Sequence, residues 1–168
     1  MENRTGSVFH RVHDSRHGTS SSLRPDRGAS ARPPLMHRTR ARELVLFALY
    51  QSEFLPVSLE DVLEEEDPGD QRDYIAGAFG GVNDRRDEID RLIGERTVGW
   101  RFERLALLDR NILRIGVYEL LFCDDVPAEV AMDEAVELAK KYGTEQAQSF
   151  INGILDRIWR GERERTAS

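Results

Sequence analysis

The residues with the clearest potential for chemistry are three arginines at the start of a helical pattern, Arg38, Arg40 and Arg42. Each guanidinium is a planar fork of N–H donors that matches phosphate oxygens and can stack on an exposed base. Arg38 and Arg42 lie one turn apart on the same face of a helix, whereas Arg40 points elsewhere. Because cations are mildly unfavourable at the positive end of a helix, this arrangement favours a functional role. An ordinary solvated helix start is the alternative interpretation.

A second set of polar and aromatic residues lies where two later helices are expected to meet. It runs from Lys140 to Gln146 and includes Phe150. The amide of Gln146 can hydrogen-bond the edge of a base, and an exposed Phe150 can stack on one, which contributes about 1–3 kcal/mol per base. A position in the hydrophobic core is the alternative for Phe150. Both sets contain the residue types that bind unpaired RNA.

The residue types that enzymes use are scarce in the patterned part of the chain. The four histidines are His10, His13, His17 and His37. No histidine follows them to assist the lone Cys123, so histidine or thiol catalysis is not expected. The first three have a spacing like that of a zinc site, but their Ser-, Gly- and Arg-rich surroundings predict no fixed backbone. The acidic run Glu64–Asp67 is interpreted as a solvated helix end. We therefore expect no catalytic residue, no cofactor and no metal.

Charge is distributed unevenly along the 168 residues, which carry a formal net charge of −7. Residues 1–42 hold nine arginines and three acids, a net of +6, so the remaining residues carry the difference, −13. A basic segment on an acidic body predicts two surfaces for two kinds of partner, unless the arginines only keep a tail soluble. The single cysteine and the absence of an apolar run of roughly 20 residues predict a cytoplasmic protein with no membrane partner.

Hydrophobic periodicity predicts an all-α fold of about seven helices and no convincing strand. The expected helices cover residues 38–54, 58–66, 70–93, about 100–107, 109–121, 127–142 and 144–160. The helix that begins at Asp109 is apolar nearly all round and should be the central one. Ser58–Asp61 resembles a capping box, and Gly80-Gly81 could allow a close helix crossing. Trp100 is expected to pack under the bundle, and Ala135, Ala139 and Gly153 should let helices approach each other.

The composition also predicts how the chain is divided. Residues 1–36 are expected to be a disordered basic extension, because Ser, Gly and Pro are frequent there and apolar residues are few, and Met36 could be the natural start. Residues 37–161 form the expected helical domain, with two packed subdomains at about 37–99 and 100–161. Residues 162–168 are expected to be a charged, frayed tail.

Several segments resemble the NusB family of transcription antitermination factors. They are Arg38–Arg42 with Ala48–Tyr50, Asp109–Leu121, Asp125–Pro127, Val130–Ala131 with Asp133–Gly143, and Phe150–Asp156. The resemblance covers about residues 37–160 and is densest in the C-terminal half, while residues 56–100 match mainly in helix pattern. It implies a NusB-like bundle of two helical subdomains.

The resemblance also implies a function. Members of the family bind single-stranded boxA RNA of ribosomal RNA transcripts together with the ribosomal protein NusE, and so support rRNA transcription through the RNA polymerase elongation complex. The positions that contact RNA in the family fall on Arg38, Thr39, Arg40, Arg42, Gln146 and Phe150, and the position that contacts NusE falls on Asp109. Some members of the family pair with themselves, so a homodimer is possible.

This sequence departs from the family pattern at a few positions. Thr39 stands where arginine is common, so one phosphate contact is in doubt, and Gln146 stands where an acid is frequent, which should favour RNA. Met132-Asp133 stands where Ile-Asn is usual. One alternative function is a helical protein-interaction module without a direct RNA role. Another is the helical domain that precedes the catalytic domain of some rRNA cytosine methyltransferases, which the missing Rossmann-type half disfavours.

Overall fold

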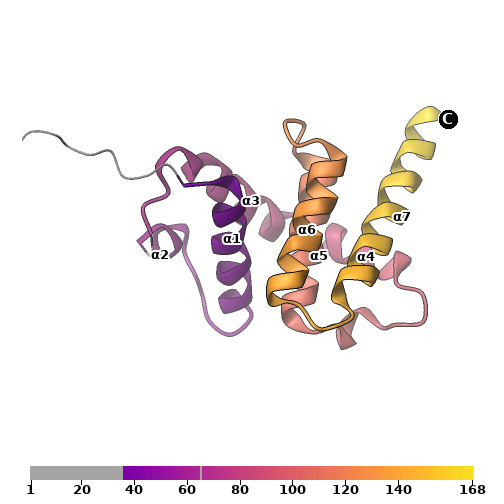
Figure 1. The fold of residues 1–168 in the computed structure, drawn as a ribbon, viewed down its shortest axis with the longest axis horizontal. Coiled ribbons are helices and arrows are strands. Elements are labelled where there is room, and N and C mark those ends of the chain that lie inside the picture. Colours follow the sequence, from indigo (N-terminus) through magenta and orange to yellow (C-terminus); the bar gives the residue numbers. More distant parts are fainter. Residues whose placement is uncertain (1–35, 65) are drawn as a thin grey trace, which may run out of the picture. The chain divides into compact units, whose positions relative to one another are not determined.

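The computed structural model describes residues 36–64 and 66–168, which form seven α-helices and two short 3-10 turns and contain no strand (Figure 1). The elements are α1 (Arg38–Ser52), α2 (Leu59–Glu64), η1 (Gly69–Gln71), α3 (Arg72–Asp84), α4 (Arg86–Arg96), η2 (Phe102–Arg104), α5 (Leu107–Phe122), α6 (Ala128–Tyr142) and α7 (Ala147–Ala167). The prediction of an all-α fold is confirmed. The expected disorder of residues 1–35 and the three histidines there lie outside the described residues, whereas Met36, which was expected to belong to the disordered extension, is buried in the core.

Helix α5 is the centre of the fold, as its apolar pattern predicted. It packs against α1, α3, α4, α6 and α7. Every residue from Asn111 to Leu120 is buried except Tyr118, which is half-buried. A helix that is apolar on all sides can bury its surface only when other helices surround it, and this one is enclosed by helices from both ends of the chain.

Glycines allow the closest helix contacts. A Cβ at Gly116 of α5 would lie 2.8 Å from a methyl carbon of Leu155 in α7 and 3.4 Å from the Cβ of Ala135 in α6. A Cβ at Gly81 of α3 would overlap the Tyr118 ring, so the expected close crossing at the glycine pair occurs at its second member. Gly153 has no close neighbour of this kind, because its nearest atom is Nη1 of Arg157 at 3.6 Å. The expectation that Gly153 brings two helices together was wrong.

Some helix ends differ from those expected. The pattern over residues 70–93 is divided into α3 and α4 at Arg85, and α4 then packs against α5 and α7. The capping box is confirmed, because the Ser58 hydroxyl accepts the Asp61 amide at 3.1 Å and the Asp61 carboxylate accepts the Ser58 amide at 2.8 Å. Helix α7 continues to Ala167, beyond residue 161 where the domain was expected to end. None of the helices described is long and apolar enough to cross a membrane.

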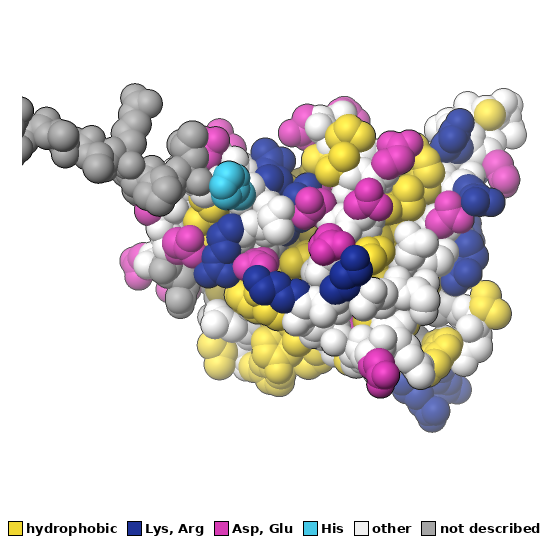
Figure 2. Space-filling view, in the orientation of Figure 1, with side chains coloured by type: hydrophobic (Ala, Val, Ile, Leu, Met, Phe, Trp, Pro, Cys, Tyr) yellow, Lys and Arg dark blue, Asp and Glu magenta, His cyan; other side chains and the backbone are white. Residues whose placement is uncertain are grey.

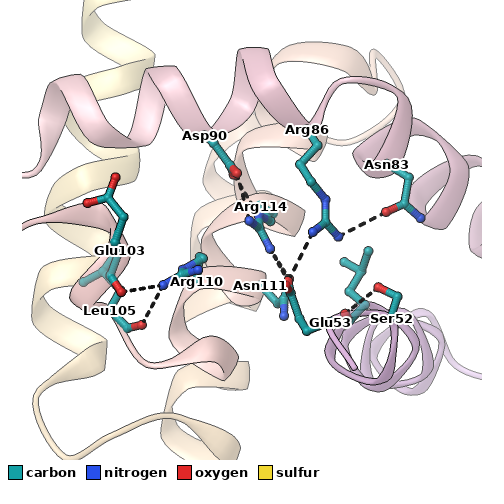
Figure 3. A network of polar contacts seen from close by, with 11 residues as sticks. Ser52, Glu53, Asn83, Arg86, Asp90, Glu103, Leu105, Arg110, Asn111 and Arg114 are labelled. Carbon is teal, nitrogen blue, oxygen red and sulfur yellow. Dashed lines mark hydrogen bonds and ion pairs between the residues drawn. The ribbon is translucent and has the colours of Figure 1, made fainter. Parts of the chain in front are cut away.

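A buried arginine joins the end of α1 and the middle of α4 to the central helix (Figure 3). Arg114 of α5 donates to both oxygens of Asp90 at 2.7 and 2.8 Å, to Glu53 at 2.5 Å and to Asn111 at 2.9 Å. Burial opposes its charge, yet the two carboxylates outweigh that effect and raise the pKa of Arg114. This network holds the end of α1 and the middle of α4 against α5.

Candidate nucleic-acid interface

Arg42, the last of the three arginines that open α1, points into the protein. Its side chain is 4% exposed, and its Nε donates to both oxygens of Glu119 in α5, at 2.9 and 3.2 Å. Glu134 of α6 lies 3.3 Å from Nη1 of the same guanidinium. Arg42 was predicted to contact RNA, but in this conformation its guanidinium has almost no free surface. Its contacts attach α1 to the C-terminal helices instead.

The environment of this buried ion pair is strongly polarised. The hydroxyl of Tyr74 in α3 donates to Glu119 at 2.8 Å. Burial raises the pKa of Tyr74 well above its usual range, and the Glu119 charge raises it further, so the phenol remains a hydrogen-bond donor. Burial also raises the pKa of Glu119, although Arg42 opposes the shift. The carboxylate therefore depends on Arg42 for its charge.

Arg40 forms looser ion pairs at the surface. Its Nε lies 2.8 Å from Glu66 and its Nη1 lies 2.8 Å from Glu43, while 42% of its side chain remains exposed. These hydrogen bonds, that to Glu43 first, raise the pKa of Arg40. The pair with Glu66 is exposed on both sides, and such pairs contribute about 0–1 kcal/mol, so a phosphate could compete with Glu66 for the guanidinium. The Glu43 carboxylate, in contrast, is only 6% exposed. Arg40 is paired but not enclosed.

Among the described residues, Arg38 and Thr39 are held by single hydrogen bonds and not by ion pairs. Arg38 donates from Nε to the amide oxygen of Gln71 at 2.6 Å, and its guanidinium lies 4.2 Å from the centre of the Tyr74 ring. Within residues 36–64 and 66–168 it forms no ion pair. The exposed hydroxyl of Thr39 donates to Glu134 at 3.3 Å. The start of α1 therefore runs from a guanidinium without a carboxylate partner to one that is fully enclosed.

Acidic side chains surround this basic start. Glu43 accepts from Lys141 of α6 at 2.5 Å and from Arg40 at 2.8 Å. Burial alone would raise the pKa of Glu43, but these hydrogen bonds outweigh it and lower the pKa. Figure 2 shows Lys and Arg side chains interspersed with Asp and Glu over the face that carries α1 and α6. This face has mixed charge and is not a continuous basic patch.

Asp109, predicted to contact NusE, is also directed inward. Its residue is 2% exposed, and its two carboxylate oxygens accept the backbone N–H of Thr144 at 3.1 Å and the Thr144 hydroxyl at 2.7 Å. The last helix was predicted to begin at Thr144, but α7 begins at Ala147 and Thr144 is bound to Asp109 instead. A Cβ at Gly143 would lie 2.9 Å from Oδ1 of Asp109, so this position requires glycine. The buried Asp109 carboxylate therefore holds the α6–α7 connection in place through Thr144.

Gln146 and Phe150 lie at the start of α7. Gln146 is exposed directly before the helix, and Phe150 is half-buried one turn later. Phe150 lines a hollow of about 230 Å³ together with Trp100 from the connection between α4 and α5. Trp100 was expected under the bundle, but it is 62% exposed. The sequence contains no pattern that shows whether the Trp100 side chain faces the core or the solvent.

Comparison with known proteins assigns this arrangement to a family. The model of the NusB family matches residues 39–160. A transcription antitermination protein NusB from Desulfotalea psychrophila is 41% identical over 132 residues, which cover 72% of this chain and 94% of the relative. Another from Myxococcus xanthus is 40% identical over 130 residues and covers 72% and 93%. The chain belongs to the NusB family.

Solved structures of NusB proteins share this fold. The NusB structure of T. maritima is 41% identical, with a TM-score of 0.68, and the match covers 75% of this chain and 92% of that one. A structure of the antitermination factors NusB and NusE in complex with double-stranded RNA matches at 29% identity and a TM-score of 0.65, covering 75% and 99%. The helices formed by this sequence are therefore those of a NusB protein.

Proposed function

We propose that this chain is a transcription antitermination factor that binds RNA together with NusE. The observation that carries the proposal is its likeness, along nearly the whole length of the relatives, to proteins named for transcription antitermination and to a NusB that was solved with NusE and RNA. The RNA is proposed to be the single-stranded boxA element of rRNA transcripts. The effect on the RNA polymerase elongation complex would be indirect and would take place in the cytoplasm.

The start of α1 is proposed as one part of the RNA surface, with unequal roles for its residues. Arg38 has no carboxylate partner among the described residues, and Arg40 keeps 42% of its side chain exposed while it pairs with the exposed Glu66 and the buried Glu43, so both can turn to phosphate oxygens. Thr39 supplies an exposed hydroxyl beside them. Arg42 would hold the helix in place for these contacts, because its own guanidinium is enclosed.

The contact with NusE is proposed on the acidic body of the protein. A net charge of −13 beyond residue 42 suits a basic ribosomal protein. Asp109 would act on this contact through the shape of the α6–α7 connection, since its carboxylate is occupied by Thr144. A homodimer remains a prediction, and it would compete with these partners for surface.

We also propose that the protein has no enzymatic activity. Burial, followed by the charges of Glu119 and Asp125, raises the pKa of the Cys123 thiol to about 11. At neutral pH this cysteine is therefore protonated and a poor nucleophile. Within the described part of the chain no group of three or more His, Cys, Asp and Glu side chains is placed to hold a metal ion.

The decisive experiment measures RNA binding with and without NusE. Fluorescence anisotropy of a labelled boxA RNA should give a dissociation constant that decreases when NusE is added. A double-stranded RNA of the same length tests the preference for unpaired RNA. If NusE brings no gain in affinity and the chain alone binds no RNA, the protein-interaction module becomes the better account.

Arg40→Ala should weaken boxA binding by about 3- to 10-fold and reduce the slope of log K against log salt concentration by about one, because one phosphate is no longer neutralised. The matched control is Arg91→Ala, which removes the same charge from an exposed arginine of α4 that is also paired, with Glu95 at 2.6 Å. An equal reduction of affinity by both substitutions would mean that only net charge matters and would remove Arg40 from the site.

A further inference from the structure

A hollow between the α4–α5 connection and α7 has the features of a binding site for a planar ring. Val98, Trp100 and Leu105 contribute from the connection, and Phe150, Gly153 and Ile154 contribute from α7. Its volume of about 230 Å³ is below the range of roughly 300–1,000 Å³ typical of sites for drug-sized ligands, so it suits a single ring system. We call it the Trp100 hollow.

The rim of the Trp100 hollow is apolar and exposed to an unusual degree. Trp100 is 62% exposed and Val98 is 78% exposed, although most large apolar side chains of the described residues are buried or partly buried. An indole in water at the edge of a hollow offers a flat face for stacking. Phe150 provides a second aromatic side chain within the same hollow. These are the side chains on which single-stranded nucleic acids stack their bases.

The arginine that lines the Trp100 hollow, and three others in the adjoining segment 96–104, resemble Arg38 and differ from Arg40 and Arg42 in their lack of ion pairs with described residues. Arg96, Arg101, Arg104 and Arg157 form no ion pair with any residue of the described ranges, whereas Arg40 and Arg42 are each paired with two carboxylates. Residues 96–104 include three arginines and one acid, on a body that is otherwise strongly acidic. Four cations without a carboxylate partner among the described residues therefore lie on, or next in sequence to, the segments that line the hollow, in addition to Arg38 at the start of α1.

One of these arginines is held at the rim by the backbone. Arg157 of α7 donates from Nη2 to the carbonyl oxygen of Arg96, the last residue of α4, at 3.0 Å. This hydrogen bond fixes the guanidinium next to the hollow and leaves its charge uncompensated. Cations without carboxylate partners would repel a basic protein such as NusE, so charge complementarity favours RNA at this face.

We infer that the Trp100 hollow receives one unpaired nucleobase of the bound RNA, which stacks on Trp100 and Phe150 while the neighbouring phosphates meet Arg101, Arg104 and Arg157. This inference rests on the proposed RNA-binding function and extends it to a second RNA surface, away from the start of α1. Trp100 and the three arginines would be additional RNA-binding residues.

The first test compares two aromatic residues of equal exposure. With a 12-nucleotide single-stranded boxA RNA and saturating NusE, Trp100→Ala should weaken binding by about 5- to 150-fold, and Trp100→Phe should recover most of the affinity. Phe54→Ala is the matched control, because Phe54 is 63% exposed at the end of α1 and should leave the affinity unchanged. Thermal melts of each variant check that the fold is retained.

The second test identifies the base by a double-mutant cycle. Abasic nucleotides are placed along the RNA one position at a time, and each RNA is titrated against the wild type and Trp100→Ala. One position should weaken binding to the wild type by about 5- to 150-fold and have little further effect in the variant. Trp159→Phe leaves Trp100 as the only tryptophan. In this variant, the intact RNA should quench the fluorescence of Trp100, because a base stacks on the indole. The RNA that is abasic at the identified position should cause no quenching.

The third test concerns the phosphates. Substituting Arg101 and Arg104 with Gln should lower the salt slope by about one for each phosphate that is no longer neutralised, while Trp100→Ala should leave the slope unchanged. If the wild type binds no RNA, the proposed function itself fails. If the wild type binds RNA and Trp100→Ala binds it equally well, only the present inference is overturned. It is also overturned if Trp100→Ala weakens NusE binding measured without RNA and leaves RNA binding intact.

Discussion

At the scale of single residues, the availability of a charge matters more than its presence. Three arginines open α1, yet one is free of carboxylates among the described residues, one is loosely paired and one is enclosed. The difference arises because Arg42 faces α5, where it is only 4% exposed beside the buried Glu119, whereas Arg40 keeps 42% of its side chain in solvent beside Glu43 and Glu66. Alanine substitutions at these three positions would therefore measure different quantities.

Arg42→Ala is expected to lower the free energy of unfolding by about 3–5 kcal/mol, because it leaves the buried carboxylate of Glu119 without a cation. The difference in the free energy of unfolding between Arg42→Ala and the wild type should become smaller at lower pH. The pKa of Glu119 is already raised in the folded protein, and a protonated Glu119 no longer needs a partner. Chemical denaturation between pH 5 and 8 would measure both effects.

The control for this prediction is the double variant Arg42→Met with Glu119→Gln. It removes both charges and keeps an acceptor for the Tyr74 hydroxyl, so it should be more stable than Arg42→Ala alone. An Arg42→Ala protein as stable as the wild type would contradict the burial of this pair. It would also restore Arg42 as a candidate for direct contact with RNA.

At the scale of helices, the contact between α3 and α5 depends on one member of a glycine pair. A Cβ at Gly81 would come within 2.5 Å of the Tyr118 hydroxyl oxygen, whereas a Cβ at Gly80 would have no neighbour within 4 Å. Both glycines lie in the interior of α3 and weaken it to a similar extent as isolated helix residues. Only tertiary packing separates their roles.

Gly80→Ala should therefore stabilise the protein by up to about 1 kcal/mol through helix propensity, and Gly81→Ala should destabilise it by about 1–3 kcal/mol through overpacking against Tyr118. Differential scanning calorimetry of the two variants provides the comparison. Adding Tyr118→Ala to Gly81→Ala should recover part of the stability. Two variants with equal melting temperatures would show that Tyr118 can move aside without cost.

At the scale of the whole molecule, stability should be graded from the centre outward. Helix α5 contacts five other helices and is buried over most of its length, while α2 has one buried residue, Val62. Local openings expose the least buried elements first, and the core exchanges its amide hydrogens only by global unfolding. Hydrogen-exchange mass spectrometry should find the fastest exchange in α2 and the slowest in α5. Comparable rates in both would mean that α5 does not organise the fold.

The sequence alone determined the helical class, the approximate bounds of most helices, the central place of α5 and the family. These properties follow from hydrophobic periodicity, caps and motifs, which are local and can be read along the chain. The capping box at Ser58 was predicted for the same reason, since its two partners are three residues apart. The candidate arginines and aromatics were also found by type and spacing.

Only the tertiary structure decided which of those residues face solvent. Arg42 meets Glu119 across 77 positions of sequence, and Asp109 meets Thr144 across 35. No local pattern encodes these encounters, because a polar side chain can be buried only where a distant partner satisfies it. Trp100 shows the converse, because an aromatic residue expected in the core was left at the surface beside arginines without carboxylate partners in the described residues.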